Sequence, residues 1–372
     1  MSDFVPVNEP LLNGNEKKYL IQCIDSGWIS SDGPFVSEFE KKFASRVNRK
    51  HAIAVTNGTT AIDLAIEVLD IRPGDEVIMP TFTIISCILQ IIRLGATPVF
   101  VDSDSNTWNM DVTQIEKKIT KKTKAIMMVH IYGLPVDINP LLEIANRHNI
   151  KVIEDAAEMH GQNYFNLPCG SFGDISTFSF YANKNITTGE GGMVVTDSDD
   201  LAEKCRSLRN LCFSSEKRFV HTRLGWNMRM TNLQAAVGLA QLERLDEFVA
   251  KKRSIGDFYN KAFENISALK LPEKSRDYST NIYWVYGLVI RKNIGLDAAK
   301  AMKELLKRKI GTRPFFYPMH SQPYFVELGM FKGETYPVAE NLYNRGFYIP
   351  SGLALTESQM TQVSNAILEI FT

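Results

Sequence analysis

Alternating strand-like and helix-like runs between residues 52 and 197 constrain the fold of this chain most strongly. Segments of helical periodicity lie between several short apolar runs. In the first of them Ala61, Leu64, Ala65, Val68 and Leu69 recur at the spacing of one buried helix face. This alternation predicts an α/β layer on a mainly parallel or mixed sheet. The apolar runs are residues 52–55, 76–79, 97–101, 125–129, 152–153, 177–180 and 193–195.

The C-terminal third lacks the regular alternation of strand-like and helix-like runs. A helical pattern without proline runs from Thr231 towards Phe263, and Thr231 or Asn232 suits its cap. A strand-like run (283–290), a helix (297–309), a loop (313–323) and a terminal helix after Thr356 follow. The chain has 372 residues, which suits one large domain and one smaller one. We therefore expect a large α/β domain over residues 1–250 and a small α+β domain over residues 251–372, packed directly together.

Charge and composition narrow the possible partners and location. Lys and Arg total 42, as do Asp and Glu, and no basic run occurs, so neither nucleic acid nor an anionic membrane is expected as a partner. The most apolar window, residues 84–94, is too short and too polar to span a bilayer. The N-terminus lacks the pattern of a secretory signal. Five widely spaced cysteines without a CxxC pair favour a reducing cytoplasm over a disulfide or metal framework.

Lys184 is the first candidate for chemistry. Phe178 and Phe180 alternate with polar residues, which predicts a strand leading into the loop that holds this lysine, and a glycine-rich turn follows it. A lysine held there could be desolvated, which lowers its pKa and makes a nucleophilic amine. The alternative is an ordinary solvated loop lysine.

Asp155 follows a short apolar strand and therefore belongs at the carboxyl edge of the sheet, where open α/β sheets bind ligands. An aspartate there could hold a proton on a pyridine nitrogen, which would make pyridoxal phosphate (PLP) a stronger electron sink. The alternative is a helix cap or a salt bridge at the strand end.

Residues 56–60, Thr-Asn-Gly-Thr-Thr, directly precede the periodic helix that begins at Ala61. Backbone N–H groups and hydroxyls at a helix start form an anion site, to which Ser179 could add a hydroxyl. An ordinary turn and cap would explain the segment equally well by itself. The order of the three elements is more informative: a phosphate turn, a strand-end aspartate, then a loop lysine followed by glycines.

These motifs resemble those of the PLP-dependent nucleotide-sugar aminotransferases of the DegT/StrS type. That family belongs to fold-type I of the aspartate aminotransferase superfamily. The resemblance extends over nearly the whole chain, and it implies a large mixed-sheet α/β domain with a smaller C-terminal α+β domain. The matching segments are residues 27–31, 56–60, 73–78, 129–133, 153–158, 173–180, 188–194 and 227–232.

The resemblance implies roles for particular residues. Lys184 matches the lysine that bonds covalently to PLP and then moves the proton, and Asp155 matches the partner of the pyridine nitrogen. Glu158 takes the position beside the cofactor's phenolic oxygen. Asn227 matches a region that reaches the phosphate from the neighbouring subunit, which implies a homodimer with shared active sites. The expected phosphate contacts are Gly58, Thr59 and Ser179.

One position departs from the family pattern. Many relatives carry an aromatic residue that stacks on the cofactor ring where this chain has Ile84. Either aliphatic packing covers the ring, or Phe82 does. No metal ligand is expected, because the histidines lack ligand-like spacing. His160 is the one histidine near Asp155 that could face the cofactor or substrate.

Substrate contacts are expected in two loops. Trp28, Ser30 and Ser31 match the family's N-terminal active-site loop, although Trp28 could equally be a core aromatic. The loop of residues 312–320 is stiffened by proline and borders the sugar-nucleotide site in the family. Arg313 suits a diphosphate through bidentate hydrogen bonds, or it forms a structural salt bridge. The other two residues expected here are Tyr317 and His320.

The implied reaction has two halves in one site. L-glutamate gives up its amino group and leaves as 2-oxoglutarate, with pyridoxamine phosphate as the intermediate form of the cofactor. The amino group then passes to C4 of a nucleotide-linked 4-keto-6-deoxy sugar. Residues 183–192 and 312–320 are most similar to members that convert GDP-4-keto-6-deoxy-D-mannose to GDP-perosamine. The alternatives are a UDP- or dTDP-linked keto sugar, or a PLP-fold regulatory or binding protein without catalysis.

Overall fold

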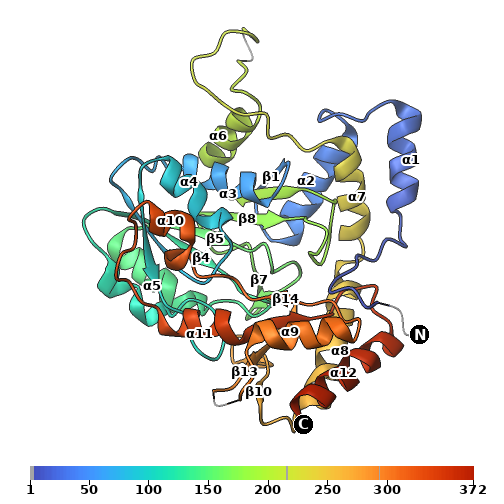
Figure 1. The fold of residues 1–372 in the computed structure, drawn as a ribbon. Helices are drawn as coiled ribbons and strands as arrows, with labels where there is room; N and C mark the ends of the chain where they lie inside the picture. Colours follow the sequence, from blue (N-terminus) through green and yellow to red (C-terminus); the bar gives the residue numbers. More distant parts are fainter. Residues whose placement is uncertain (1–3, 215–216, 293) are drawn as a thin grey trace.

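The computed structural model describes residues 4–214, 217–292 and 294–372, and a seven-stranded sheet lies at the centre of its N-terminal part (Figure 1). The strand order is β1-β9-β8-β5-β4-β2-β3. Strand β9 runs antiparallel to both of its neighbours, and the other pairs are parallel. The mixed α/β sheet predicted from the sequence is therefore present. Its strands are β1 (His51–Val55), β2 (Glu76–Pro80), β3 (Thr97–Val101), β4 (Thr123–Val129), β5 (Lys151–Asp155), β8 (Ile175–Ser179) and β9 (Gly192–Thr196).

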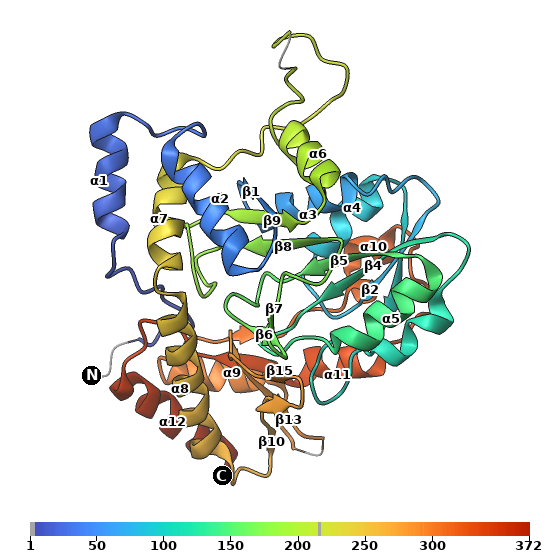
Figure 2. The same ribbon diagram turned by 180° about the vertical axis from the view of Figure 1, so that it is seen from behind.

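Helices cover both faces of the sheet, because alternate side chains of each strand point to opposite faces. In β1, Ile53 and Val55 join one apolar cluster, whereas Ala52 and Ala54 join another. Helices α3 (Gly58–Glu67), α4 (Ser86–Arg93) and α6 (Asp199–Arg209) cover the first face. Helices α2 (Pro34–Arg46), α5 (Ile138–His148) and α7 (Asn232–Leu242) cover the second, and α1 (Glu16–Ser26) packs against α7 (Figure 2).

Helix α3 starts at Gly58, within the predicted turn of residues 56–60 and three residues before the predicted start at Ala61. The side chain of Asn57 accepts a hydrogen bond from the backbone N–H of Thr60 at 2.9 Å, and the Thr60 hydroxyl accepts one from the N–H of Asn57 at 3.2 Å. Such a cap is worth about 1 kcal/mol. The predicted apolar face of Ala61, Leu64 and Ala65 is fully buried. The cap thus fixes where the backbone at the helix start points.

The helical pattern from Thr231 to Phe263 forms two helices rather than one. Thr231 caps α7 through a capping box, and a turn at residues 243–244 separates α7 from α8 (Leu245–Phe263). Arg244 leaves helical geometry with φ −112° and ψ 12°. The break allows α7 to pack on α1 and α2 while α8 packs on the C-terminal helix. Tertiary packing therefore divides the predicted helix into α7 and α8. The hydrophobic periodicity of the sequence carries no information on this packing.

The C-terminal part contains a second sheet of order β10-β13-β15-β14. Val5 pairs with Ile310, so the N-terminal segment joins this layer. The predicted boundary at residue 250 lies within α8 and stays a prediction. The strands are β10 (Leu269–Lys270), β13 (Tyr286–Ile290), β14 (Arg313–Pro314) and β15 (Gly346–Ile349). The helices are α9 (Ala298–Lys307), α10 (Pro323–Glu327), α11 (Pro337–Arg345) and α12 (Glu357–Phe371).

Short elements complete the described chain. Two-residue strands pair as β6 (Asn163–Tyr164) with β7 (Leu167–Pro168), and as β11 (Ser275–Arg276) with β12 (Ser279–Thr280). The 3-10 turns are η1 (Val112–Gln114), η2 (Glu116–Lys118) and η3 (Met319–Ser321).

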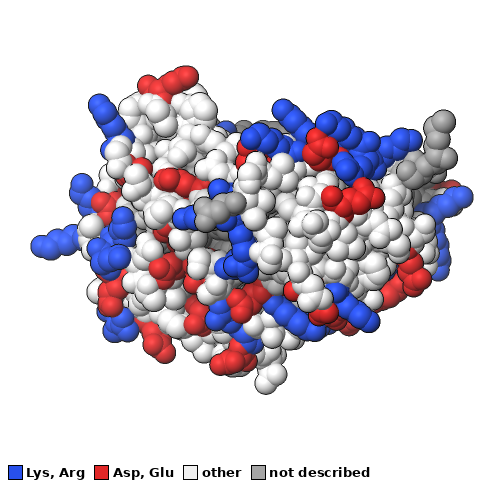
Figure 3. Space-filling view, turned by 60° about the horizontal axis from the view of Figure 1, so that its bottom comes forward, with Lys and Arg blue, Asp and Glu red and all other residues white. Residues whose placement is uncertain are grey.

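The surface carries both signs of charge. On the face shown in Figure 3, Lys and Arg side chains are interspersed with Asp and Glu. Within residues 4–214, 217–292 and 294–372, no helix combines the length and apolarity needed to cross a bilayer.

Candidate active site

A cavity of about 660 Å³ lies where the carboxyl ends of β4, β5 and β8 meet the start of α3. Parallel strands end at the same edge of a sheet, so residues far apart in the sequence converge there. The cavity is lined by six of the eight residues that the sequence analysis assigned to the cofactor, namely Gly58, Thr59, Asp155, Glu158, Ser179 and Lys184.

Lys184 projects its amine into this cavity, and its side chain is only 11% exposed. It follows β8 in a turn, in which its backbone N–H donates to the carbonyl of Tyr181 at 2.9 Å. Its Nζ lies 4.0 Å from Glu158 Oε1 and 3.9 Å from the centroid of the Trp284 ring. Burial lowers the pKa of Lys184, although the nearby carboxylates act in the opposite direction. Of the two alternatives that the loop pattern left open, the structure therefore favours the desolvated lysine over the solvated one.

Two carboxyl groups face the amine. Asp155 is the last residue of β5, and its Oδ1 accepts the Ala157 N–H at 3.0 Å while its Oδ2 accepts from the Cys87 thiol at 3.3 Å. Burial raises the pKa of Asp155 against these hydrogen bonds. Burial also raises the pKa of Glu158, to about 8, although its Oε2 accepts the Tyr132 N–H at 2.6 Å. Such opposed shifts on neighbouring groups are typical of catalytic sites.

The start of α3 forms the opposite wall of the cavity. A methyl group on Gly58 would lie 2.6 Å from the Cβ of Ser179, so only glycine allows the helix start to approach the end of β8 this closely. The hydroxyl of Thr59 shares a 2.8 Å hydrogen bond with Ser86. The helix start and the hydroxyl residues Thr59, Ser86 and Ser179 thus line the same cavity, which suits a phosphate.

Phe82 and Ile84 occupy different environments. The Phe82 side chain is fully buried, and its ring packs against Tyr132, Phe315 and Phe316 behind the cavity wall. Ile84 instead lines the cavity and is 47% exposed. Of the two candidates to cover a ring, the aliphatic residue therefore has the access.

The N-terminal loop and Asn227 lie apart from the lining of this cavity. Asn232, at the start of α7, holds the loop by donating from Nδ2 to the Trp28 carbonyl at 2.6 Å and from its backbone N–H to the Ser30 carbonyl at 2.8 Å. The Trp28 side chain is half exposed, so it is not a core aromatic. Ser31 lines a separate cavity of about 160 Å³. Asn227 is exposed, and its Oδ1 accepts from Arg229 Nε at 2.9 Å.

The loop that begins at Arg313 divides between two environments. Exposed Arg313 lines a cavity of about 240 Å³ that shares Tyr181, Asn183 and Tyr348 with the main one. His320 is buried away from the lining, where Nδ1 lies 2.8 Å from Thr81 Oγ1 and Nε2 lies 3.2 Å from Glu340. These bonds hold the loop against β2. The ring of Tyr317 packs edge-on against Tyr343 at 4.5 Å.

His160 is buried beside the site rather than in its lining. Its ring packs between Phe178 and Phe180, at 5.3 and 5.5 Å. Neither ring nitrogen makes a hydrogen bond of normal geometry to the described residues. Burial lowers the pKa of His160 to about 3, and the nearby Lys184 charge adds to this effect. The imidazole is therefore neutral at physiological pH.

Sequence reasoning missed several residues of the cavity. Trp284 and Tyr348 come from the C-terminal sheet region, and Phe316 comes from the loop after β14. The run of residues 283–290 predicted a strand. No local pattern indicates that Trp284, near its start, reaches Lys184, which lies one hundred residues earlier in the chain. The remaining missed lining residues are Ile62, Thr83, Ser86, Val129, His130, Ile131, Ala157, Thr177, Phe178, Tyr181, Asn183 and Glu190.

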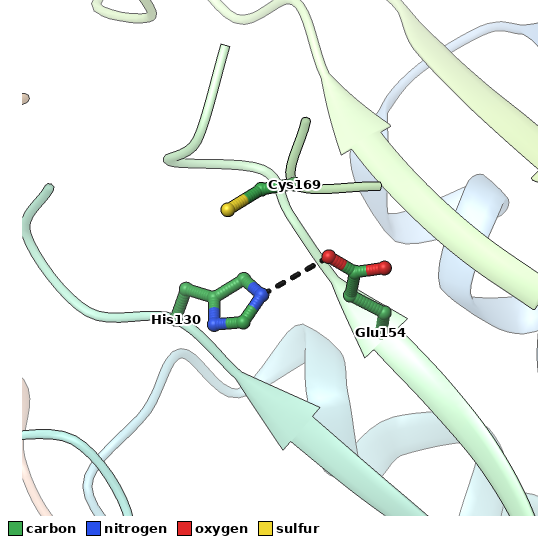
Figure 4. A group of neighbouring side chains, drawn as sticks. All are labelled: His130, Glu154 and Cys169. Carbon is green, nitrogen blue, oxygen red and sulfur yellow. Dashed lines mark hydrogen bonds and ion pairs between the residues drawn. The ribbon is translucent and has the colours of Figure 1, made fainter. Parts of the chain in front are cut away.

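His130, Glu154 and Cys169 form a buried cluster with the spacing of metal ligands (Figure 4). Their atoms already serve the protein. His130 Nε2 lies 3.1 Å from Glu154 Oε1, and its Nδ1 accepts the Val136 N–H at 3.1 Å. Glu154 also accepts from the N–H groups of residues 170, 172 and 173 and from the Ser176 hydroxyl. The cluster therefore fastens the loop before β8 rather than offering free ligands.

The cavity suits a phosphorylated heterocycle. The close approach at Gly58 makes an anion cradle at one end, and the buried Asp155 at the other end suits a protonated ring nitrogen. The Lys184 amine lies between the two walls with a lowered pKa, as a carbonyl-reactive amine requires. The chemistry of these side chains thus fits PLP.

Comparisons with known proteins agree with this reading. The sequence model of the DegT/DnrJ/EryC1/StrS aminotransferase family matches residues 10–368. GDP-perosamine synthase of Escherichia coli O157:H7 is 44% identical over 369 residues, with 99% of each chain covered, and that of Vibrio cholerae is 40% identical over 367 residues, also with 99% of each covered. The X-ray structure of an aminotransferase from Psychrobacter cryohalolentis superposes with a TM-score of 0.92 at 31% identity, covering 99% of this chain and 98% of that one.

The chain belongs to the DegT/DnrJ/EryC1/StrS aminotransferase family. The resemblance stated from the motifs is therefore confirmed, as are the fold class and the enzyme class.

Proposed function

We propose that this protein transfers an amino group from L-glutamate to C4 of GDP-4-keto-6-deoxy-D-mannose, with PLP as its cofactor, and so makes GDP-perosamine. The names of the full-length relatives support the substrate and product. The observation that carries the proposal is the buried Lys184 amine, which shares one cavity with two carboxyl groups and a helix start. A carbonyl-reactive amine, a ring-nitrogen partner and a phosphate cradle are together what such chemistry requires.

Five contacts support the holding of the cofactor. Gly58, Thr59 and Ser179 would bind its phosphate, and Asp155 would keep a proton on its ring nitrogen. Glu158 would lie beside its phenolic oxygen. PLP, when bound, supplies an electron sink for the carbon that gives up its proton.

Lys184 moves the proton in this proposal. Its Nζ would take the proton from the carbon that bears the amino group, and the ammonium so formed would act as the acid that gives the proton back later in the transfer. A lowered pKa suits this exchange, because the neutral amine can accept a proton near physiological pH. Asp155 keeps its carboxylate fixed through the Ala157 and Cys87 hydrogen bonds. Pyridoxamine phosphate is the form that would carry the amino group between the two half-reactions.

The adjoining cavity supports a nucleotide-sugar substrate. Tyr181, Asn183 and Tyr348 line both cavities, so the two adjoin one another. Exposed Arg313, whose guanidinium donates to the Thr312 carbonyl, would bind the diphosphate there. Trp28, Ser30, Ser31 and Tyr317 remain our proposed outer contacts with the substrate.

A homodimer with shared sites is part of the proposal. The described residues between α6 and α7 extend beyond the body of the molecule (Figure 1), and Phe219, Leu224 and Trp226 expose apolar surface there. Exposed apolar side chains of this kind favour a protein interface. Asn227 lies at the base of this segment and outside its own cavity, as expected if it acts in the partner's site. Five unpaired cysteines support our placement of the enzyme in the cytoplasm.

The decisive experiment offers isotope-labelled L-glutamate with GDP-, UDP- and dTDP-linked 4-keto-6-deoxy sugars in parallel. We expect label in the GDP sugar amine and a stoichiometric amount of 2-oxoglutarate, with ping-pong kinetics. Label in only the UDP or dTDP sugar would overturn the nucleotide assignment. Failure of the enzyme to consume glutamate with any acceptor would favour a binding or regulatory protein instead.

A further inference from the structure

Trp284 makes three polar contacts near Lys184, two through its indole ring and one through its backbone carbonyl. Its ring centroid lies 3.9 Å from Lys184 Nζ, and its Nε1 donates to the carbonyl of Asn183 at 2.9 Å. The backbone carbonyl of Trp284 accepts a hydrogen bond from Lys252 Nζ at 2.7 Å. The side chain is almost fully buried, yet it lines the cavity. Hydrogen bonds therefore hold both the ring and the backbone of Trp284 beside the amine of Lys184.

Lys252 anchors this arrangement from helix α8. Its buried Nζ donates to the carbonyls of Trp284 and Ser351, which lie before β13 and after β15. Burial lowers the pKa of Lys252 to about 7, and no carboxylate opposes that effect. The lysine therefore joins the helix to the two central strands of the second sheet, and it holds the backbone at Trp284 in place.

The charged groups around Lys184 lie on other elements. Asp155, Glu158 and Cys87 act on its charge from β5, the turn after it and α4, and His160 lies close enough for the Lys184 charge to lower the pKa of its imidazole. The carboxyl groups favour the ammonium form, and burial opposes it. The face of an indole ring also attracts an ammonium ion, more strongly where water is excluded.

We propose that Trp284 is a positioning residue for Lys184, whose indole face receives the amine as an ammonium when that amine is not bonded to the cofactor. This inference rests on the proposed function, because it gives a resting place to the amine between the two half-reactions. The ammonium rests against the ring and stays within reach of the cavity. The Asn183 and Lys252 contacts keep the ring there before the amine is released.

The test measures the Lys184 amine directly in full-length protein freed of cofactor. Formaldehyde and cyanoborohydride methylate neutral amines, so the extent of Lys184 methylation against pH, read by mass spectrometry, reports its titration. We expect Trp284→Met to lower the midpoint by about one pH unit, because it keeps an apolar side chain but removes the ring face. Trp284→Phe keeps a weaker ring face and should lower the midpoint by less.

Trp108→Phe is the matched control. Trp108 is as deeply buried, and its Nε1 has no hydrogen-bond partner among the described residues, so the substitution should leave the Lys184 midpoint unchanged. A second readout is the tryptophan fluorescence of Trp284, obtained by subtracting the spectrum of Trp284→Phe from that of the wild type. This difference should change with pH at the same midpoint as Lys184 methylation in the wild type. An unchanged midpoint in Trp284→Met, with thermal unfolding like that of the wild type, would overturn the inference. If that variant does not fold, an unchanged midpoint in Trp284→Phe would do so.

This outcome is separable from the proposed function. The methylation test needs no sugar nucleotide, so a shifted midpoint in an enzyme that aminates no GDP sugar would contradict the substrate alone. Amination with an unshifted midpoint would contradict only the role of Trp284.

Discussion

The thiol of Cys87 donates a hydrogen bond to the carboxylate of Asp155, with 3.3 Å between Sγ and Oδ2. Thr83 Oγ1 lies 3.2 Å from the same sulfur, so a short chain of polar atoms runs from α4 to the end of β5. This contact lowers the pKa of Asp155 against the larger effect of burial. The thiol therefore helps to keep ionised the carboxylate that we assign to the ring nitrogen.

Replacement of Cys87 tests this contact. Cys87→Val removes the donor at similar volume, and we expect PLP to bind about fivefold to tenfold more weakly because a buried carboxylate loses a hydrogen bond. Cys87→Ser restores a donor and should restore the affinity. The measurement is a cofactor titration by absorbance. Equal affinity in the valine variant and the wild type would show that the contact is incidental.

Lys184→Ala and Asp155→Asn should each abolish most amino transfer, by about a thousandfold or more, because one removes the proton carrier and the other the ring-nitrogen partner. The rate of 2-oxoglutarate formation measures this loss. Lys151→Ala is the control, since this exposed lysine begins strand β5, which ends at Asp155, and its side chain pairs with Asp174. An active Lys184→Ala variant would refute the assigned role.

His160 predicts a loss of stability in acid. Its folded pKa of about 3 lies below the ordinary value of 6.5, so the folded protein resists protonation there. A lowered pKa of this kind contributes stability above pH 6.5 that is lost as the pH falls towards 3, and the loss at pH 4 is about 3 kcal/mol. His160→Gln should therefore lose less thermal stability than wild type between pH 7 and pH 4.

The control for that comparison is His221→Gln, because His221 is exposed. Its melting temperature should follow the wild type across the same range of pH. Parallel curves for wild type and His160→Gln would mean that the imidazole becomes protonated without cost.

Gly58→Ala should both destabilise the fold and weaken the phosphate site. The added methyl group would lie 2.6 Å from Ser179 Cβ, so either α3 or the end of β8 must shift. We expect a loss of about 1–3 kcal/mol, measured by denaturant unfolding, together with weaker PLP binding. At Gly295 a Cβ meets open space, so Gly295→Ala should leave both quantities unchanged. Unaltered cofactor affinity in Gly58→Ala would contradict the phosphate assignment.

Mixed subunits test whether Asn227 acts across a dimer. Lys184→Ala and Asn227→Ala proteins should each be weak, but a hybrid carries one site in which both residues are intact. With random exchange of subunits, amino transfer should recover to about a quarter of the wild-type rate. Recovery no greater than the mean of the two parents would place Asn227 outside the partner's site.

Local patterns predicted the positions where the chain turns into or out of regular structure. Each predicted strand of the large sheet exists, and the aspartate at a strand end, the capped turn and the loop lysine do line one cavity. Strand ends and helix starts have local signatures, and a parallel sheet brings such ends together. Asp155, Gly58 and Lys184 could therefore be placed from the sequence.

Contacts between distant segments could not be placed in this way. Trp284 reaches Lys184 only because α8 and the second sheet hold it there, and Phe82 is turned into the core by three aromatic neighbours. The division of the helical pattern at residue 244 has the same origin, since it depends on what each helix packs against. These outcomes follow from tertiary packing, on which periodicity and caps carry no information.

The antiparallel pairing of β8 with β9 has a consequence for the reach of the amine. Ser179 pairs with Gly192, so the chain leaves the sheet and returns to it at directly opposed positions. The two ends of the loop that carries Lys184 are held together by the hydrogen bonds between β8 and β9. We therefore expect the backbone of these loop ends to move little. Rotation about the bonds of the lysine side chain, which has four methylene groups, must then provide the movement of the amine between its bonded and free positions. The length of that arm, rather than a hinge in the main chain, sets how far the nitrogen can travel.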